Sequence, residues 1–302
     1  MALLIEIYDT TLRDVAQGEG LSFSLADKLD LTHAIDSLGV HYIEGGWPGS
    51  NPKDMAYFEA IRGIRLKNAR VVAFGSTRHA KNSACNDPNL QQLVASRAPI
   101  GCIVGKSWDL AVREALRVSL EENLDMISSS VEFLKDRVEQ VFFDAEHFLD
   151  GYNSNREYAL KALRAAAEAG AQALVLCDTN GGNLPSRIGE ATAEVVKAFP
   201  SVAIGIHAHN DSGMAVANSV EAVRAGAIQV QGTINGFGER TGNADLVQIL
   251  PNLELKLGKD CIGADRLQRL TEVSRYVYEV ANLPLHDSQP FVGRSAFAHK
   301  AG

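Results

Sequence analysis

The chain has 302 residues, of which 46% are hydrophobic, with 29 basic and 37 acidic side chains and a formal net charge of −8. Such a composition is typical of a folded globular protein, and an acidic chain without a lysine- or arginine-rich run is a poor match for nucleic acid or anionic lipid. No segment reaches the ~18 consecutive apolar residues of a membrane span, and the first residues lack the basic region of a signal peptide. We therefore expect no nucleic acid and no membrane as partners.

The four cysteines are widely spaced, at Cys85, Cys102, Cys177 and Cys261. They form neither a CxxC pair nor a zinc knuckle, and this usage is typical of a reducing compartment, so we expect a cytoplasmic protein. Cys177 lies in a predicted strand, where a buried thiol that fills the core is a better interpretation than a nucleophile.

Short β-branched segments alternate with helical patterns along most of the chain. A strand–helix unit takes roughly 30 residues, and eight such units in order typically close into an α/β barrel, the (β/α)8 TIM barrel. An open, doubly wound sheet is the alternative, although no GxGxxG turn follows the first strand. The predicted strands are Leu3–Tyr8, Tyr42–Gly45, Arg70–Gly75, Pro99–Val104, Gln140–Phe143, Ala173–Cys177, Ala203–His207 and Ala227–Gly232.

Capping signals support several helix boundaries. Ser24 precedes a helical pattern and has a carboxylate three residues on, as in a capping box, and Gly39 and Gly170 stand where helices should end. The predicted helices include Ser24–Leu38, Leu110–Glu121, Asn155–Ala169 and a last one at about Ala264–Ala281. We predict a TIM-barrel catalytic domain over residues 1–280 and, over residues 281–302, the truncated start of a linker or subdomain.

Polar residues gather where the predicted strands end. In a TIM barrel the active site lies at the carboxyl ends of the strands, so these residues are the candidates for chemistry. They occur in the segments Asp9–Asp14, Glu44–Asn51, Asp144–His147, Asp178–Gly181, His207–Asp211 and Asn235–Asn243.

The most specific of these signals is His207-Ala208-His209. Residues two apart on a strand face the same side, so both imidazoles can reach one ion; the alternative is two hydrogen-bonded structural histidines. Asp14 and Asn243 could add oxygen ligands. A nitrogen and oxygen set without cysteine suits Mn²⁺, Mg²⁺, Fe²⁺, Co²⁺ or Zn²⁺, with open positions for a substrate.

Arg13, next to Asp14, is the second candidate. A guanidinium recognises a carboxylate or stabilises a developing oxyanion, whereas the alternative is an ordinary surface salt bridge. Glu44 and Glu146 could orient ligands, move protons or pair with Arg13, and Glu44 and Gln17 are candidates for substrate contacts. The glycine-rich segment 235–242 either lets the backbone approach a ligand or simply forms a tight loop.

Three motifs in this order resemble one family across essentially the whole chain. Asp9-Thr-Thr-Leu-Arg-Asp14, His207-Ala-His-Asn-Asp211 and Asn235-Gly-Phe-Gly-Glu-Arg-Thr-Gly-Asn243 are similar to motifs of the barrel metalloenzymes that include 2-isopropylmalate, homocitrate and citramalate synthases. Hydroxymethylglutaryl-CoA lyase and the keto-acid aldolases are more distant relatives. The segments Glu44–Asp54 and Phe142–Tyr152 look most like the citramalate synthase branch.

The resemblance implies an acyltransferase of amino-acid biosynthesis, serving isoleucine or leucine, that condenses acetyl-CoA with a 2-oxo acid, here pyruvate, to give citramalate. It implies a homodimer and a divalent metal held by Asp14, His207, His209 and Asn243. Arg13 would polarise the keto carbonyl, Thr179 would bind the keto-acid carboxylate, and Glu146 would help to place the acetyl group or its enolate.

Two features depart from the family pattern. The family has glycine directly after its Arg-Asp pair, where this chain has Val15; if that position needs a positive φ, a β-branched residue is strained there. The segment Phe297–Gly302 resembles a motif that normally continues to a histidine of the catalytic base, and the family carries a further subdomain and often a regulatory domain.

Several alternatives share this sequence pattern. An isopropylmalate or homocitrate synthase would use the same mechanism on a longer 2-oxo acid, and bulky side chains at Trp47, Phe74 or Tyr152 would favour pyruvate. A lyase or aldolase would cleave a carbon–carbon bond with the same metal ligands. A barrel that only binds ligands is the third alternative.

Overall fold

A computed structural model describes residues 4–300, and a closed barrel of parallel strands forms its centre. Each strand pairs with the next in the chain, and the last pairs with the first, where Glu6 is opposite Gln229. This closure confirms the predicted TIM barrel and excludes the open sheet. The strands are β1 (Glu6–Asp9), β2 (Tyr42–Gly46), β3 (Arg70–Ser76), β4 (Ile100–Lys106), β5 (Gln140–Glu146), β6 (Ala173–Asp178), β7 (Ala203–Ala208) and β8 (Gln229–Gly232).

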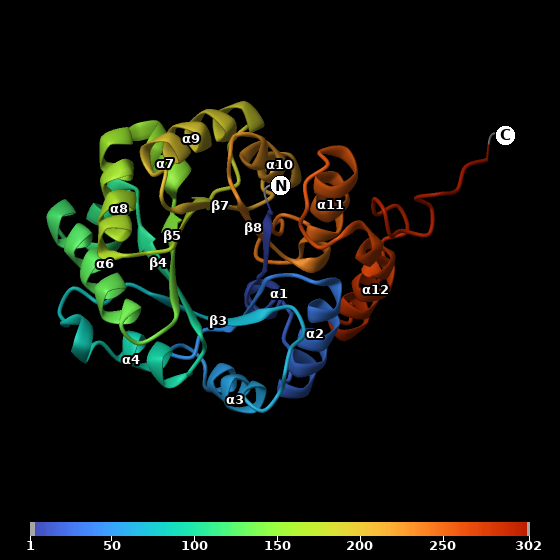
Figure 1. Cartoon of the computed structure of the whole chain (residues 1–302), viewed down its shortest axis with the longest axis horizontal. Coiled ribbons are helices and arrows are strands. Elements are labelled where there is room, and N and C mark those ends of the chain that lie inside the picture. The colour runs from blue at the N-terminus through green and yellow to red at the C-terminus, as the bar shows by residue number, and fades with distance from the viewer. Residues whose placement is uncertain (1–3, 301–302) are drawn as a thin grey trace.

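Helices surround the barrel (Figure 1). They are α1 (Thr11–Asp14), α2 (Leu25–Leu38), α3 (Pro52–Ile61), α4 (Pro88–Ala95), α5 (Asp109–Ala111), α6 (Leu120–Lys135), α7 (Phe148–Ser154), α8 (Arg156–Ala169), α9 (Pro185–Ala198), α10 (Ala215–Arg224), α11 (Leu246–Pro251) and α12 (Leu270–Val280). No helix in the described range is both long and apolar enough to cross a membrane.

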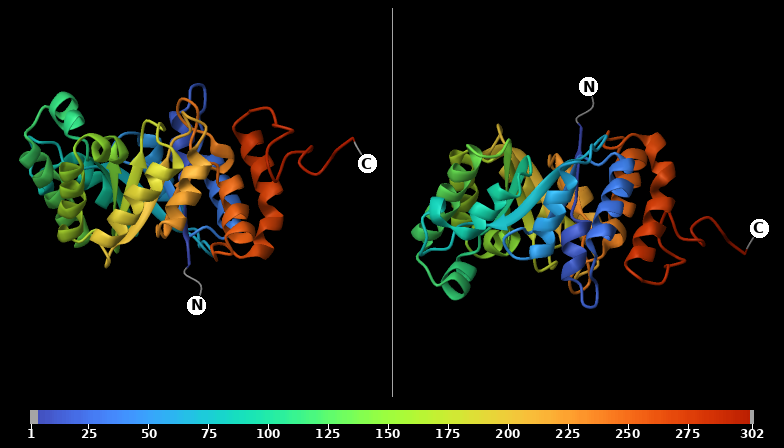
Figure 2. Two further views of the ribbon diagram at one scale, coloured as in Figure 1. Left: turned by 90° about the horizontal axis from the view of Figure 1, so that it is seen from above. Right: turned by 90° about the horizontal axis from the view of Figure 1, so that it is seen from below.

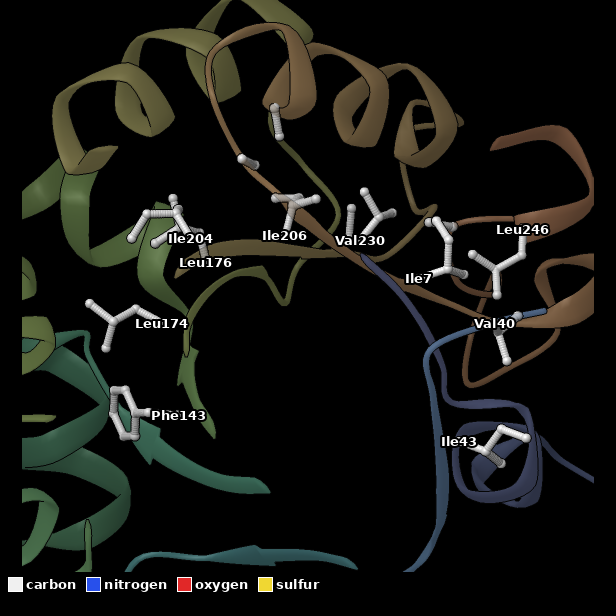
Figure 3. Packing of buried hydrophobic residues seen from close by; sticks show 14 of the residues in the cluster. Ile7, Val40, Ile43, Phe143, Leu174, Leu176, Ile204, Ile206, Val230 and Leu246 are labelled. Carbon is white, nitrogen blue, oxygen red and sulfur yellow. The ribbon is translucent and has the colours of Figure 1, made fainter. Parts of the chain in front are cut away.

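The period of two along each strand divides the apolar core into two layers. Residues such as Phe143, Leu174 and Ile206 point outwards, where they pack beneath the helices (Figure 3). A second cluster fills the inside of the barrel and consists of Tyr8, Tyr42, Val72, Phe74, Ile100, Cys102, Phe142 and Ala173. The barrel is therefore a packed body, and its interior side chains form a floor beneath the strand ends.

The helix boundaries confirm the capping predictions. The Ser24 hydroxyl accepts a hydrogen bond from the Asp27 amide while the Asp27 carboxylate accepts one from the Ser24 amide, which completes a capping box. Gly39 and Gly170 end α2 and α8 with φ values of 86° and 111°. Residues with side chains are strained in this left-handed region, so glycine is the favoured terminator here.

Two predicted helices were wrong in extent. Leu110–Glu121 is not continuous, because Arg117 adopts a left-handed conformation with φ 58° and Ser119 then caps a new helix, α6. The predicted helix Ala264–Ala281 begins with a 3₁₀ segment over Ala264–Arg269 before α12. The first strand starts later than predicted, at Glu6, and Leu3 lies outside the described residues.

After α12, residues 283–300 form no further helix or strand. Gln289 still packs on the barrel, where it is buried and its Nε2 donates to Asn235 and Asp245. The end of the described chain then runs away from the barrel (Figures 1 and 2). The linker or subdomain over residues 281–302 stays a prediction, and its last two residues lie outside the described range.

Candidate active site

A cavity of about 720 Å³ opens at the carboxyl ends of the strands. Every predicted site residue except Glu44 and Asn243 lines it, including Arg13, Asp14, Gln17, Glu146, Thr179, His207 and His209. Trp47 and Phe74 form an aromatic wall, whereas Tyr152, a predicted wall residue, is buried and donates a hydrogen bond to Glu194. The strand-end pattern therefore brings residues from distant parts of the chain to one cavity.

A short turn after β1 presents Arg13 and Asp14. The Asp9 carboxylate accepts hydrogen bonds from the Thr11 amide (3.0 Å) and hydroxyl (2.8 Å), and the Thr10 carbonyl accepts one from the Asp14 amide (2.8 Å). These bonds form the single helical turn α1 directly at the strand end. As a result, consecutive residues place a guanidinium and a carboxylate in the cavity wall.

Arg13 is held on three sides. Its Nε donates to Glu44, its Nη1 lies 2.6 Å from Asp14 Oδ1, and its Cζ lies 3.9 Å from the centroid of the Phe74 ring. Burial alone would lower the pKa of Arg13, but Asp14 and Glu44 raise it above its usual range, so the guanidinium stays charged. This arrangement confirms a pairing between Glu44 and Arg13 and excludes a loose surface salt bridge.

Glu44 lies beneath the cavity and does not line it. Its side chain is fully buried and accepts a 2.6 Å hydrogen bond from the Tyr8 hydroxyl in addition to its bond from Arg13. Burial raises the pKa of the Glu44 carboxyl, and Arg13 opposes that shift. Glu44 therefore contacts Arg13 directly but does not reach the cavity, where a substrate would lie.

The backbone at Val15 is not strained, so the condition for a misplaced Asp14 is not met. Its φ is −63° and its ψ is −35°, which are ordinary right-handed helical values. Val15 is fully buried in the outer core and begins the 3₁₀ turn Val15–Gln17. Because glycine is not needed for this backbone conformation, the departure from the family pattern leaves Asp14 in place.

The two histidines stand at the end of β7 with their Nδ1 atoms turned away from the cavity centre. His207 Nδ1 is 2.9 Å from Gln231 Oε1, and His209 Nδ1 is 2.7 Å from the Thr179 carbonyl oxygen. Burial lowers the pKa of His207 to about 4, against an opposing contribution from Asp14, so its ring is neutral near pH 7. Both Nε2 atoms face inwards and lie 3.2 Å apart.

The predicted ligands leave acceptor atoms unpaired. Asp14 Oδ2 and Asn243 Oδ1 are buried without a hydrogen-bond partner, and Asp14 Oδ2 is 4.0 Å from His207 Nε2. Such atoms each cost about 1–3 kcal/mol unless something pairs with them. Across residues 4–300, no three His, Cys, Asp or Glu side chains form a closed metal cluster, but these two unpaired oxygens and the two imidazole Nε2 atoms fit the nitrogen and oxygen preferences of a divalent cation.

Asn243 reaches this region through the loop after β8. It forms an isolated bridge with His209, and its Nδ2 donates to the Phe237 carbonyl (3.2 Å), which leaves Oδ1 free. A Cβ at Gly238 would lie 2.1 Å from Asn243 Nδ2. The glycine at position 238 is therefore required for this close approach, and the glycine-rich loop serves to place a side chain.

The remaining predicted residues lie around the cavity wall. The Thr179 hydroxyl accepts from the His147 amide (2.8 Å), Glu146 pairs with Lys106, and Gln17 is exposed at the rim. Cys177 also lines the cavity, but burial raises the pKa of its thiol, which agrees with the prediction that it is no nucleophile.

Sequence reasoning missed several polar residues of the site, among them Lys106 in the cavity wall and Gln231 beneath it, and it assigned no role to Asp144. Burial raises the pKa of Asp144 to about 6, while hydrogen bonds from Cys102 and Gln231 and the charge of Arg13 lower it. Lys106 has the same parity along β4 as the inward-facing Cys102, so strand parity alone could have identified it.

Comparisons with known proteins agree with this geometry. The family model described as HMGL-like matches residues 4–277. The chain belongs to the HMGL-like family. Among curated HMGL-like relatives, the (R)-citramalate synthase of Aquifex aeolicus is 55% identical over 100% of this chain and 57% of its own length. The probable 2-isopropylmalate synthase of Methanopyrus kandleri is 36% identical over 99% of this chain and 57% of its own length.

A solved HMGL-like structure shares the fold. The HMG-CoA lyase of Brucella melitensis has a TM-score of 0.77 at 17% identity and covers 93% of this chain and 100% of its own. The chain spans just over half the length of the curated citramalate synthases it matches. Five relatives with that name are 50–55% identical, whereas three named 2-isopropylmalate synthases are 34–36% identical.

Proposed function

We propose that this chain is the barrel of a divalent-metal-dependent acyltransferase that condenses acetyl-CoA with pyruvate and water to give citramalate and CoA. The observation that carries the proposal is the group of unpaired acceptor atoms beside Arg13, in a chain with 50–55% identity to proteins named (R)-citramalate synthase. The product would supply isoleucine biosynthesis. We also propose that the protein acts as a cytoplasmic homodimer.

In this proposal Asp14, His207, His209 and Asn243 hold a divalent metal such as Mn²⁺, Mg²⁺, Zn²⁺ or Co²⁺. When bound, the metal would supply Lewis acidity to the keto carbonyl and carboxylate of the 2-oxo acid. The unpaired oxygen atoms of Asp14 and Asn243 support this ligand set, since a cation would pair with both.

Arg13 would stabilise the negative charge that develops on the keto oxygen. Its guanidinium is held by Glu44 and Asp14 and stays charged, so the donor is oriented before the reaction begins. Thr179, with Gln17 at the rim, would bind the carboxylate of the 2-oxo acid.

Glu146 would position the acetyl group of acetyl-CoA or its enolate. It forms an ion pair with Lys106 inside the cavity, with side chains 26% and 24% exposed, and Lys106 offers a donor to an enolate oxygen. Lys81 and Arg117, both basic and exposed, also line the cavity and suit the phosphate groups of CoA.

We propose pyruvate as the 2-oxo acid, because bulky aromatic side chains form part of the cavity wall. Trp47 and Phe74 pack edge-to-face at 5.3 Å, and Arg13 Cζ lies 3.9 Å from the centroid of the Phe74 ring. We expect a branched chain such as that of 2-oxoisovalerate to crowd these rings more than the methyl group of pyruvate does. A hydrophobic pocket of this kind discriminates by about 10–200-fold.

Isothermal titration of the chain with pyruvate and with 2-oxoisovalerate, in Mn²⁺ and again in EDTA, tests the proposal. We expect pyruvate to bind only with Mn²⁺, and 2-oxoisovalerate to bind at least ~10-fold more weakly. Tighter binding of 2-oxoisovalerate would favour an isopropylmalate synthase. Absence of Mn²⁺-dependent binding of either acid would contradict the proposal, and release of pyruvate from citramalyl-CoA or citramalate would favour a lyase.

A further inference from the structure

Gln231 links His207 to a carboxylate on the other side of the barrel. It lies in β8 directly opposite His207 in β7, and its side chain is fully buried. Its Nε2 is 3.1 Å from Asp144 Oδ1, in β5, and its Oε1 is 2.9 Å from His207 Nδ1. One amide therefore connects side chains from three strands.

The chemistry of the three groups sets the direction of these hydrogen bonds. An ionised carboxylate only accepts hydrogen bonds, so the NH₂ group of Gln231 must face Asp144 and its carbonyl oxygen must face His207. The Nδ1 atom of His207 must then carry the proton. Its Nε2 atom is then an acceptor, 3.2 Å from His209 Nε2 and 4.0 Å from the unpaired oxygen of Asp14.

His209 differs, because two groups of opposite kind contact its Nδ1 atom. The Thr179 carbonyl oxygen, 2.7 Å away, can only accept a hydrogen bond, whereas Arg240 Nη2, 2.8 Å away, can only donate one. The hydrogen bonds of His209 therefore do not fix its tautomer, and only His207 is held with Nε2 unprotonated, the form that binds a metal.

We propose that Gln231 and Asp144 are positioning residues that hold His207 in its metal-binding tautomer and ring orientation before any metal arrives. The metal part of this inference rests on the proposed function, whereas the tautomer part concerns the metal-free protein. Gln231 itself does not line the cavity, so it acts only through His207.

The same strand provides a matched control. Gln229 lies two residues before Gln231, faces the same side of β8 and is also fully buried. Its Nε2 contacts only Glu6, at 3.5 Å, and its Oε1 has no partner. Gln229→Met and Gln231→Met each remove one buried amide at similar volume, but only the second removes the contact to His207.

The first experiment measures Mn²⁺ affinity by isothermal titration for the wild type and both methionine variants. Loss of a partner of this kind weakens metal binding by about 10–100-fold, and we expect that loss for Gln231→Met alone. Equal affinity of the two variants, within about twofold, would overturn the proposal.

The second experiment reads the tautomer without metal. In ¹⁵N-histidine-labelled protein, with His207 assigned by comparison with His207→Asn, we expect protonated Nδ1 in the wild type and in Gln229→Met. In Gln231→Met we expect a shift towards protonated Nε2. An unchanged tautomer there would overturn the proposal. A wild type that binds no Mn²⁺ but shows the expected tautomers would contradict the proposed function and leave the positioning role intact.

A double variant covers the case in which Gln231→Met fails to fold. Gln231→Glu alone places two carboxylates against each other and should weaken Mn²⁺ binding. Adding Asp144→Asn restores a donor at 144 facing an acceptor at 231, so the double variant should recover the His207 tautomer and most of the Mn²⁺ affinity. A double variant no better than Gln231→Glu would also overturn the proposal.

Discussion

The two halves of the barrel interior differ sharply although the same strands build both. Near the start of the strands, Tyr42 in β2 and Phe142 in β5 pack edge-to-face at 5.1 Å within the inner apolar cluster. Two residues further along the same strands, on the same inward face, stand Glu44 and Asp144. On each of these strands, the inward-facing side chain changes from an aromatic ring of the core to a buried carboxylate within two residues.

The comparison explains how buried charges are tolerated at the strand ends. Burying a carboxylate is costly unless it is paired, and here Glu44 is paired by Arg13 and Tyr8 while Asp144 accepts from Gln231. The aromatic layer below keeps these partners in fixed positions. The inner apolar layer therefore stabilises the barrel and fixes the positions of the polar side chains at the strand ends, some of which keep unpaired acceptor atoms.

The largest change in stability should come from truncating a side chain of the inner apolar cluster. Phe142→Ala removes a ring that is 2% exposed and contacts both Tyr8 and Tyr42, and we expect a loss of about 3–5 kcal/mol in the free energy of unfolding. Urea denaturation measures this loss. Metal affinity of the folded fraction should change much less, so a proportionate loss of Mn²⁺ binding would show that the two layers are not separable.

Removing a polar group at the strand ends should instead weaken metal binding and leave the free energy of unfolding nearly unchanged. His209→Ala should weaken Mn²⁺ binding by at least ~100-fold, equivalent to about 2.7 kcal/mol, because one of two nitrogen ligands is lost. Urea denaturation without metal should show little change. Metal content after dialysis, with the exposed His33→Ala as control, checks this; metal content equal to wild type would contradict the ligand assignment.

Val15→Gly tests the packing directly below Asp14. Val15 is fully buried with helical backbone angles, so glycine loses side-chain burial and adds unfolded-state entropy, for an expected loss of about 2 kcal/mol in stability. Mn²⁺ affinity should not rise. Tighter metal binding in this variant, measured by titration, would revive the idea that valine strains the site.

Local sequence patterns predicted the strands because each is a short β-branched segment bounded by turn residues. They failed at Leu110–Glu121, where good helix formers continue through Arg117 although that residue adopts a left-handed conformation. Tertiary packing, which no local pattern contains, sets that break.

Some features of the candidate site could likewise be predicted from local sequence, whereas others depend on contacts between distant residues. His207 and His209 were predictable because strand parity places them on one face. The bond between Gln231 and Asp144 joins residues 87 positions apart, and the full burial of Glu44 depends on its neighbours from other strands. Sequence reasoning could find which residues gather at the strand ends, but not which of them contact the cavity and which support the others.

The smallest expected effect lies at the opposite end of the barrel, where His41 accepts a 3.0 Å hydrogen bond from the Ile7 amide through Nδ1. Burial lowers the pKa of His41 in the folded state, against opposing contributions from Glu6 and Asp260. The unfolded chain therefore binds a proton more readily, so stability is full above the unfolded pKa of about 6.5 and falls as the pH drops below it. His41→Asn keeps an acceptor for Ile7 but does not titrate, and its free energy of unfolding should decline less than that of the wild type between pH 7.5 and 5. Identical declines in urea denaturation would contradict this prediction, because they would show that the protonation of His41 does not contribute to the loss of stability.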